Sequence, residues 1–248
     1  MGAVSPSRYT VMAGWDDVPH LDDKTKAELL ASIPPYLRGA RSTGTPSLGA
    51  GAIYPVQWED ITVAPFQIPN YWKRSYGMDV GWNRTAALWL AQDPLDNTLY
   101  GYSEYYRGQT LPVVHAEGIK ARGEWMTGEI DPASNGRAQK DGEQLLAQYR
   151  EHGLNLTPAI NAVEAGLYEV WSLIETGRLK FFNTLRYLPA EYRLYRRDEN
   201  GKIIKENDHI LDAMRYGVMG FSRSAKAKPA DASQFSTGTS AGDSKVGY

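Results

Sequence analysis

The sequence predicts an α/β fold, a mixed sheet of three antiparallel strands followed by parallel strands, with helices on its flanks. Three apolar and aromatic runs, at 75–81, 84–92 and 98–106, predict the antiparallel strands. Segments with helical periodicity then alternate with short strand-like runs, which is typical of strands added in parallel. The 248 residues suit one large domain with appendages, and a hydrophobic content of 42% is enough to fill its core.

Most elements have a local signal in the sequence. Asp93–Asn97 has the composition of a turn between the second and third strands, and Gly153 and Gly177 end the helices before them. The Asn-Gly pair in Asp198–Gly201 predicts a hairpin turn. The other predicted elements are helices at 111–122, 140–152, 158–176 and 207–219, strands at 125–130 and 179–182, and a mostly helical stretch at 183–197.

Residues 1–73 are predicted to form a connecting segment ahead of the sheet. Its clearest element is a helix at 21–33, which has acidic residues in its first turn and ends before Pro34 and Pro35. The glycine-rich stretch at 44–55 lacks the Gly-Lys-Ser/Thr ending of a phosphate-binding loop. We therefore interpret it as a connecting arm, and nothing in the sequence indicates an ATPase site.

The composition restricts the class of protein. The chain has no cysteine, which excludes disulfides and thiolate metal sites and is typical of a reducing compartment. No apolar run is long enough to cross a bilayer, so we expect no membrane association and an intracellular location. The formal net charge of −2 excludes a strongly basic protein, so any surface for nucleic acid must be local.

Two aspartates occupy positions where an acid is unusual. Asp79 lies among apolar residues of the first predicted strand, and Asp131 follows the fourth strand directly. A carboxylate in such a strand loses its water unless a partner offsets its charge. That partner is either a set of nearby backbone amides or a divalent metal ion. A third acidic group, Asp208 and Asp212, favours the metal.

The residue types indicate which metal and which chemistry. In-line cleavage of a phosphodiester can use two hard cations about 4 Å apart, one to activate water and one to stabilise the leaving oxygen. Mg²⁺ and Mn²⁺ prefer oxygen ligands, so a cluster of aspartates suits them. In this arrangement Asp79 bridges both ions, while Asp131 and the acids of the last helix each hold one side.

The third carboxylate has two candidates. Asp208 and Asp212 are four residues apart, so a helix places them on one face. Asp208 is otherwise an N-cap, a role that Asn207 can fill instead, and Asp212 otherwise pairs with Arg215. We expect both acids to face the site, with Asp212 the more important for cleavage and Asp208 a second or water-mediated ligand. His209 is either a group that positions water or an ordinary histidine at a helix start.

A basic and aromatic segment predicts contact with nucleic acid. Basic residues outnumber acidic ones between 178 and 202, and tyrosines lie between them. Such a run is otherwise a solvated helix face. The candidate phosphate contacts are Arg137, Lys140, Arg193, Arg196, Arg197 and Lys202.

Three motifs resemble one protein family. They are Gly77–Trp82, which reads GMDVGW, Ile130–Pro132, which reads IDP, and Asn207–Tyr216, which reads NDHILDAMRY. Together they are similar to the nuclease domain of the large terminase subunit of tailed phages, in the ribonuclease H-like superfamily. The resemblance covers residues 9–220. It implies a ribonuclease H-like fold and a metal-dependent endonuclease that cleaves concatemeric viral double-stranded DNA during genome packaging.

The same resemblance implies a domain organisation and a set of partners. Residues 74–222 correspond to the nuclease domain, and residues 1–73 lead to it from an ATPase domain that is absent from this sequence. Residues 223–248 form a polar tail that we expect to be disordered. The implied partners are double-stranded DNA, the ATPase domain of the same packaging motor, the small terminase subunit and the portal, all in the host cell cytoplasm.

Two other kinds of function share these features. A Holliday-junction resolvase or a ribonuclease H-type enzyme has the same acids in the same class of fold, although the long segment before the sheet argues against both. A non-catalytic module that docks DNA or the packaging motor needs the basic surface but not the acids. Cleavage assays on plasmid, junction and RNA–DNA hybrid separate the three.

Overall fold

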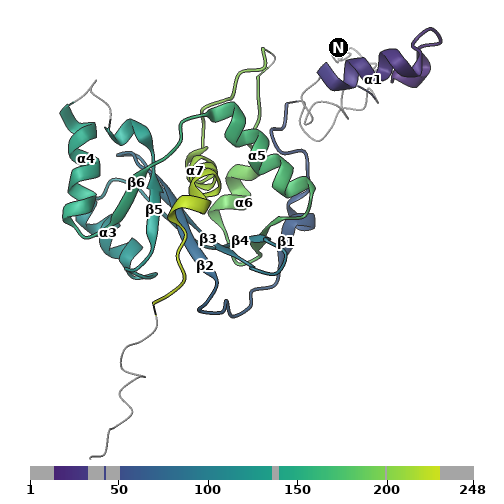
Figure 1. The fold of residues 1–248 in the computed structure, drawn as a ribbon. Coiled ribbons are helices and arrows are strands. Elements are labelled where there is room, and N and C mark those ends of the chain that lie inside the picture. The colour runs from purple at the N-terminus through teal and green to yellow at the C-terminus, as the bar shows by residue number, and fades with distance from the viewer. Residues whose placement is uncertain (1–13, 33–41, 43–50, 136–139, 199, 230–248) are drawn as a thin grey trace, which may run out of the picture.

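A mixed β-sheet organises the computed structural model, which describes residues 14–32, 42, 51–135, 140–198 and 200–229 (Figure 1). Its described strands lie in the order β1-β7-β4-β3-β2-β5-β6. The three antiparallel strands are β2 (Lys73–Asp79), β3 (Thr85–Gln92) and β4 (Leu99–Arg107). The parallel additions are β1 (Thr62–Val63), β5 (Thr127–Ile130), β6 (Asn155–Pro158) and β7 (Leu179–Phe182). The predicted fold class is therefore confirmed.

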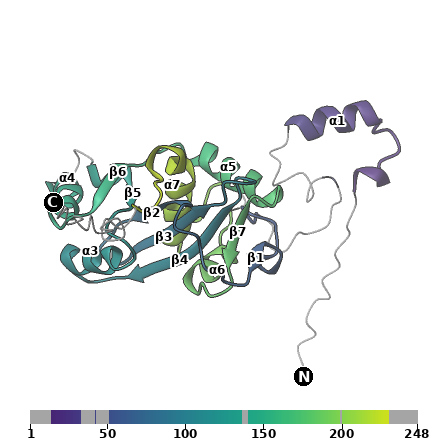
Figure 2. The ribbon, with the colours of Figure 1, turned by 60° about the horizontal axis from the view of Figure 1, so that its bottom comes forward.

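Helices cover both faces of the sheet, and the sheet separates two apolar cores. The helices of one core are α3 (Pro112–Lys120) and α4 (Lys140–Glu151), and those of the other are α5 (Val163–Glu175), α6 (Tyr187–Tyr192) and α7 (His209–Ser224). In both ribbon views, α7 lies in the middle, between α3 and α4 at one end and α5 and α6 at the other (Figures 1 and 2). A separate helix, α1 (Asp23–Ser32), lies within the predicted 21–33.

Strand alternation decides which side chains meet α7. Tyr76 and Met78 point into the core of α3 and α4, so Gly77 and Asp79 point to the opposite face. The backbones are in contact there, because a Cβ at Gly77 would lie 1.8 Å from the Ala213 carbonyl oxygen. Only glycine allows this approach, and it brings the start of α7 to the end of β2.

Residues 51–72 belong to the same body as the sheet. Ile53, Tyr54, Trp58 and Ile61 are buried in the core beneath α5, α6 and α7, and β1 adds an edge strand beside β7. These residues fall inside the segment 1–73 that the sequence predicts to be connecting. The sequence does not reveal this packing, because the few apolar residues that make it are next to a stretch rich in glycine and proline.

Two predicted helices are longer than those in the structure. The predicted helix at 158–176 begins only at Val163, because residues 155–158 form β6 beside β5. In the stretch 183–197 only α6 is helical, because the Tyr195 carbonyl accepts from the Ile53 backbone and later residues pair with 203 and 204. The hairpin that follows has the expected glycine at positive φ, Gly201.

The last helix is longer than the predicted 207–219. It continues to Ser224, and Lys226 then pairs with Arg74 at the start of β2. Residues 223–226 therefore contact the sheet and the Lys228 N–H donates to the Asn70 carbonyl, which corrects the expectation that the tail begins at 223. The rest of the expected tail, 230–248, lies outside the described residues. Of the helices in the described ranges, none has both the length and the apolar composition needed to cross a bilayer.

Gly77→Ala is expected to lower the free energy of unfolding by about 3 kcal/mol, because the added methyl group meets backbone atoms that have no room to move. Urea unfolding followed by circular dichroism measures this change. Leu95→Ala is the control, since Leu95 is 91% exposed and its truncation should change stability by less than about 0.5 kcal/mol. Equal midpoints for Gly77→Ala and wild type would contradict the direct contact of β2 with α7.

Candidate acidic active site

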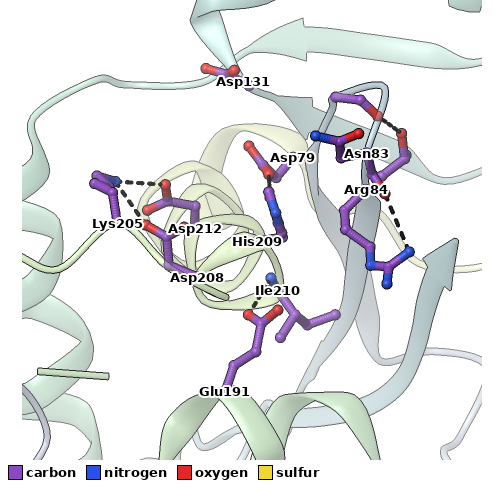
Figure 3. A network of polar contacts seen from close by, with 12 residues as sticks. Asp79, Asn83, Arg84, Asp131, Glu191, Lys205, Asp208, His209, Ile210 and Asp212 are labelled. Atoms are coloured by element: carbon purple, nitrogen blue, oxygen red, sulfur yellow. Dashed lines mark hydrogen bonds and ion pairs between the residues drawn. The ribbon is translucent and has the colours of Figure 1, made fainter. Parts of the chain in front are cut away.

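Two neighbouring strand ends bring Asp79 and Asp131 together. Strands β2 and β5 are parallel, with Gly77 opposite Glu129 and Met78 opposite Ile130. The next backbone contact continues this register, since the Asp131 N–H donates to the Met78 carbonyl at 2.9 Å. Adjacent strands lie about 4.8 Å apart, so the two carboxylates start from neighbouring points on the α7 face (Figure 3).

Asp79 is mostly buried and interacts with the histidine that begins α7. Its side chain is only 14% exposed, and one carboxylate oxygen lies 2.9 Å from His209 Nδ1. Burial raises the pKa of Asp79 to about 6, and the charges of Asp212 and Asp131 add to this, while His209 opposes it. The hydrogen bond to Asp79 in turn raises the pKa of His209. The site therefore carries more negative charge than its own histidine offsets.

The start of α7 holds the other two predicted acids. Lys205 Nζ lies 3.0 Å from Asp208 Oδ2 and 3.2 Å from Asp212 Oδ2, as Figure 3 shows. The other oxygen of Asp212 accepts a 2.7 Å hydrogen bond from the buried Arg215. The alternative partner that the sequence offers for Asp212 is thus present. Asp208 occupies the N-cap position but makes no side-chain capping bond, so that alternative is not realised.

A glutamate from another helix fills the capping role. Glu191 of α6 is buried, and it accepts from the Ile210 backbone N–H at 2.8 Å and from the Tyr106 hydroxyl at 2.7 Å. Burial raises the pKa of Glu191, although both hydrogen bonds oppose this. Sequence reasoning misses this residue, because its only local signal is an acid among buried apolar neighbours.

Asp131 and Glu129 lie two residues apart on the same strand face but have different environments. Asp131 accepts from the Tyr216 hydroxyl at 3.2 Å and from the Ala133 N–H at 2.9 Å, at the edge of the site. Glu129 is fully buried and bound by Arg223 and Ser224 at the far end of α7. Glu129 therefore anchors the helix, while Asp131 faces the site.

The predicted DNA contacts differ in their availability. Arg197 is buried, and its guanidinium donates to Glu164 at 2.6 Å and to the Gly201 carbonyl at 2.9 Å, so we exclude it from the candidate contacts. Arg193 is exposed but paired with Glu59 at 2.9 Å. Arg196 and Lys202 are exposed. Arg137 lies outside the described residues, and of Lys140 the structure describes only the backbone, at the start of α4.

The candidate ligands are of the chemical type that divalent cations prefer. All four candidate ligands are aspartates, and hard cations such as Mg²⁺ and Mn²⁺ prefer such oxygens. The raised pKa of Asp79 reflects a carboxylate whose charge is incompletely offset, which a cation would correct. Within the described ranges, however, no three acidic or histidine side chains converge closely enough to hold an ion in the present arrangement. Lys205 holds the Asp208 and Asp212 carboxylates in this arrangement.

Comparison with known sequences identifies relatives. The profile described as terminase RNaseH-like domain matches residues 76–221. The large terminase subunits of Enterobacteria phage LP7 and Salmonella phage P22 are each 34% identical over 213 residues, which is 82% of this chain. The same match covers 44% of the LP7 protein and 42% of the P22 protein, so the chain spans less than half the length of these relatives.

Solved structures agree with this match. The nuclease domain of the P22 large terminase has a TM-score of 0.68 and 32% identity, over 73% of this chain and 97% of that domain. The large terminase of a thermophilic bacteriophage has a TM-score of 0.61 and 22% identity, over 83% of this chain and 54% of that protein. The similarity to the thermophilic phage protein shows a shared fold.

In metal-free buffer, Asp79→Asn is expected to stabilise the protein above pH 6. Between pH 3.8 and about 6 the unfolded chain releases the Asp79 proton that the folded chain keeps, so the wild type loses stability as the pH rises. Asparagine has no proton to lose, so the variant should gain on the order of 1 to 3 kcal/mol above that window and nothing below it.

Urea unfolding in chelator, on both sides of this window, measures the effect. Asp96→Asn is the control, because hydrogen bonds from Thr98 lower the pKa of that exposed acid and its loss should bring no gain. A stabilisation of Asp79→Asn that is equal at all pH values would show that burial of charge is not its cause.

Proposed function

Because the chain belongs to the terminase RNaseH-like domain family, we propose that it is the nuclease unit of a tailed-phage packaging machine. In this proposal it is a metal-dependent endonuclease whose substrate is concatemeric viral double-stranded DNA, cut during genome packaging. The observation that supports it most is the pairing of Asp79 with Asp131 at neighbouring strand ends, beside the aspartates that begin α7.

Asp79, Asp131, Asp208 and Asp212 are the proposed ligands of Mg²⁺ or Mn²⁺. When bound, two such ions would supply an activated water and a stabilised leaving oxygen for hydrolysis of the phosphodiester. Asp79 experiences the charges of both Asp131 and Asp212, which supports a central, bridging position for it. Because the ions would activate the water, no side chain is needed as a general base.

The neighbouring side chains orient these acids and offset their charge. His209 holds one oxygen of Asp79, and Tyr216 donates to one oxygen of Asp131, so both carboxylates have a fixed orientation. Lys205 offsets the charges of Asp208 and Asp212 and must withdraw before the oxygens it holds can bind a cation. Arg215 is bound to the other oxygen of Asp212 and can remain there.

We propose the partners from the same relationship. The curated relatives are more than twice as long as the matched part, which supports an ATPase domain of the same motor as a neighbour of this unit. The small terminase subunit and the portal are further proposed partners, in the host cell cytoplasm. The packing of Ile53 and Trp58 into the core supports a nuclease unit that starts near residue 51.

The protein is expected to cut plasmid DNA with Mn²⁺ and to leave it intact in chelator. Asp79→Asn and Asp131→Asn should abolish cutting while duplex binding survives, because each removes a ligand charge and leaves the basic surface unchanged. Gel assays of cleavage and fluorescence anisotropy of binding measure the two effects. Glu129→Gln is an unsuitable control, since it removes the anchor of α7, so Asp96→Asn serves instead.

The choice of substrate distinguishes the alternatives. Cleavage restricted to four-way junctions or RNA–DNA hybrids indicates a resolvase or a ribonuclease H-type enzyme. Binding without cleavage under any metal, with wild-type and Asp79→Asn proteins alike, indicates a docking module and contradicts the proposal.

Asp212→Asn is expected to lower kcat by about 100-fold and Asp208→Asn by about tenfold. The reason is that the charge of Asp212 contributes to the raised pKa of Asp79, so Asp212 is the helix acid that interacts with the central carboxylate. Since Asp212 also pairs with buried Arg215, the Asp212→Asn protein is checked for its melting temperature and for Mn²⁺ affinity by calorimetry. An Asp208→Asn enzyme that is dead beside a fully active Asp212→Asn enzyme would reverse the assignment.

A further inference from the structure

The hairpin that follows Asp79 extends beyond the edge of the sheet where the acids lie. Residues 80–84 join β2 to β3, and Asp79 pairs with Ala86 at its base. The Gln109 N–H donates to the Trp82 carbonyl at 2.8 Å, and the Thr85 hydroxyl donates to the Gly81 carbonyl at 3.3 Å. The first bond ties the hairpin to the loop after β4 and the second closes the hairpin on itself, so its side chains project from a supported backbone.

Trp82 lies on this hairpin with 67% of its surface exposed. Single exposed apolar residues are ordinary, and Leu95 at the other end of β3 is exposed still more. The position distinguishes Trp82, because it comes three residues after Asp79. A chain of three residues spans at most about 10 Å. A mostly exposed aromatic residue therefore starts within about 10 Å of Asp79.

Arg84 lies on the same hairpin and is held by an aromatic stack. Its guanidinium carbon is 5.4 Å from the centre of the Tyr106 ring, and Tyr106 stacks on Tyr187 at 4.6 Å. The Tyr106 hydroxyl donates to Glu191, the residue that caps α7. The stack thus fixes Arg84 relative to the helix that carries His209 and Asp212, and Figure 3 shows Arg84 on the other side of Asp79 from Lys205.

The contact with the Tyr106 ring leaves other N–H donors of the Arg84 guanidinium available. One of them makes a 3.3 Å contact with the Asn83 carbonyl. Within the described ranges, no ion pair with a carboxylate involves Arg84. Other arginines are paired with acids, namely Arg193, Arg197, Arg215 and Arg223. Arg84 is therefore held beside Tyr106 and retains donors for an anion.

The size of a duplex connects these residues to the site. The grooves of B-DNA are about 6 and 12 Å wide, so a duplex with one phosphate at Asp79 and Asp131 also covers points within about 12 Å. Trp82 is three residues after Asp79, and Arg84 is two residues from Ala86, which pairs with Asp79 across the hairpin, so both start within about 12 Å of Asp79. An apolar ring can pack against sugars in the minor groove, and a guanidinium binds a phosphate with two hydrogen bonds.

We infer that Trp82 and Arg84 form a duplex-binding contact on the hairpin side of the acids, with Arg84 on a backbone phosphate and Trp82 in the adjoining minor groove. This inference rests on the proposed function, and it assigns part of the DNA contact to residues outside the basic segment at 178–202. Arg84 and Trp82 position the duplex, and the aspartates remain the residues that act on the scissile phosphate.

The test uses the full chain with Asp79→Asn, so that DNA is bound but not cut. Fluorescence anisotropy with a short labelled duplex gives the Kd at several salt concentrations. Arg84→Gln is expected to weaken binding about tenfold and to reduce the slope of log K against log salt by about 1. Trp82→Ala should weaken binding about tenfold with an unchanged slope, because it removes an uncharged contact.

Matched controls lie at the opposite end of the same strands. Lys73→Gln removes one positive charge at the start of β2, and Leu95→Ala removes an exposed apolar side chain after β3. Both should bind within about twofold of the parent. Arg84→Lys keeps the charge, so it should restore the slope but not the full affinity. Melting temperatures identify any variant whose fold is impaired, and Trp82→Phe then replaces Trp82→Ala, with partial recovery of affinity expected.

The outcomes are distinct. Folded Arg84→Gln and Trp82→Ala proteins that bind DNA as the parent does overturn the inference and leave the proposed function standing. An equal loss in Lys73→Gln also overturns it, because net charge alone then explains the effect. A parent and wild type that bind no DNA at all overturn the proposed function together with the inference.

Discussion

At Gly77, the backbone of β2 meets the backbone of α7 with no side chain between them, and the positions of the candidate site residues follow from this contact. A Cβ at Gly77 would overlap the Ala213 carbonyl, and one at Gly217 would lie 2.9 Å from the Gly77 nitrogen. The helix therefore crosses the strand at the smallest possible separation. Its first turn then lies at the strand end, so Asp79 meets His209 there.

The concentration of like charge that results requires compensation. Asp79 is buried, and its pKa is raised to about 6 because burial and two other aspartates oppose its ionisation. The cations that offset this charge are supplied from α7 and the loop before it, by His209, Arg215 and Lys205. Lys205 is the most exposed of the three, so it is the one that a bound metal ion can most easily replace.

The sequence predicts the strand-borne half of this site better than the helix-borne half. Asp79 and Asp131 can be placed from strand order alone, because parallel neighbours end at the same edge of a sheet. The capping by Glu191 and the burial of Arg197 depend on residues far away in the chain, Ile210 and Glu164, so no local pattern reveals them. For the same reason, residues 195–197 do not continue a helix, since their backbone pairs with residues 51–53.

The most direct test of this account is the anomalous diffraction of Mn²⁺ in crystals of the protein soaked with the ion. The account predicts manganese peaks in contact with Asp79 and Asp131, at least one of them within reach of Asp212, and a Lys205 side chain that has left the acid it neutralises. The absence of a peak at Asp79, or peaks held by Glu129 or Glu191 while Lys205 stays on Asp208 and Asp212, would contradict it.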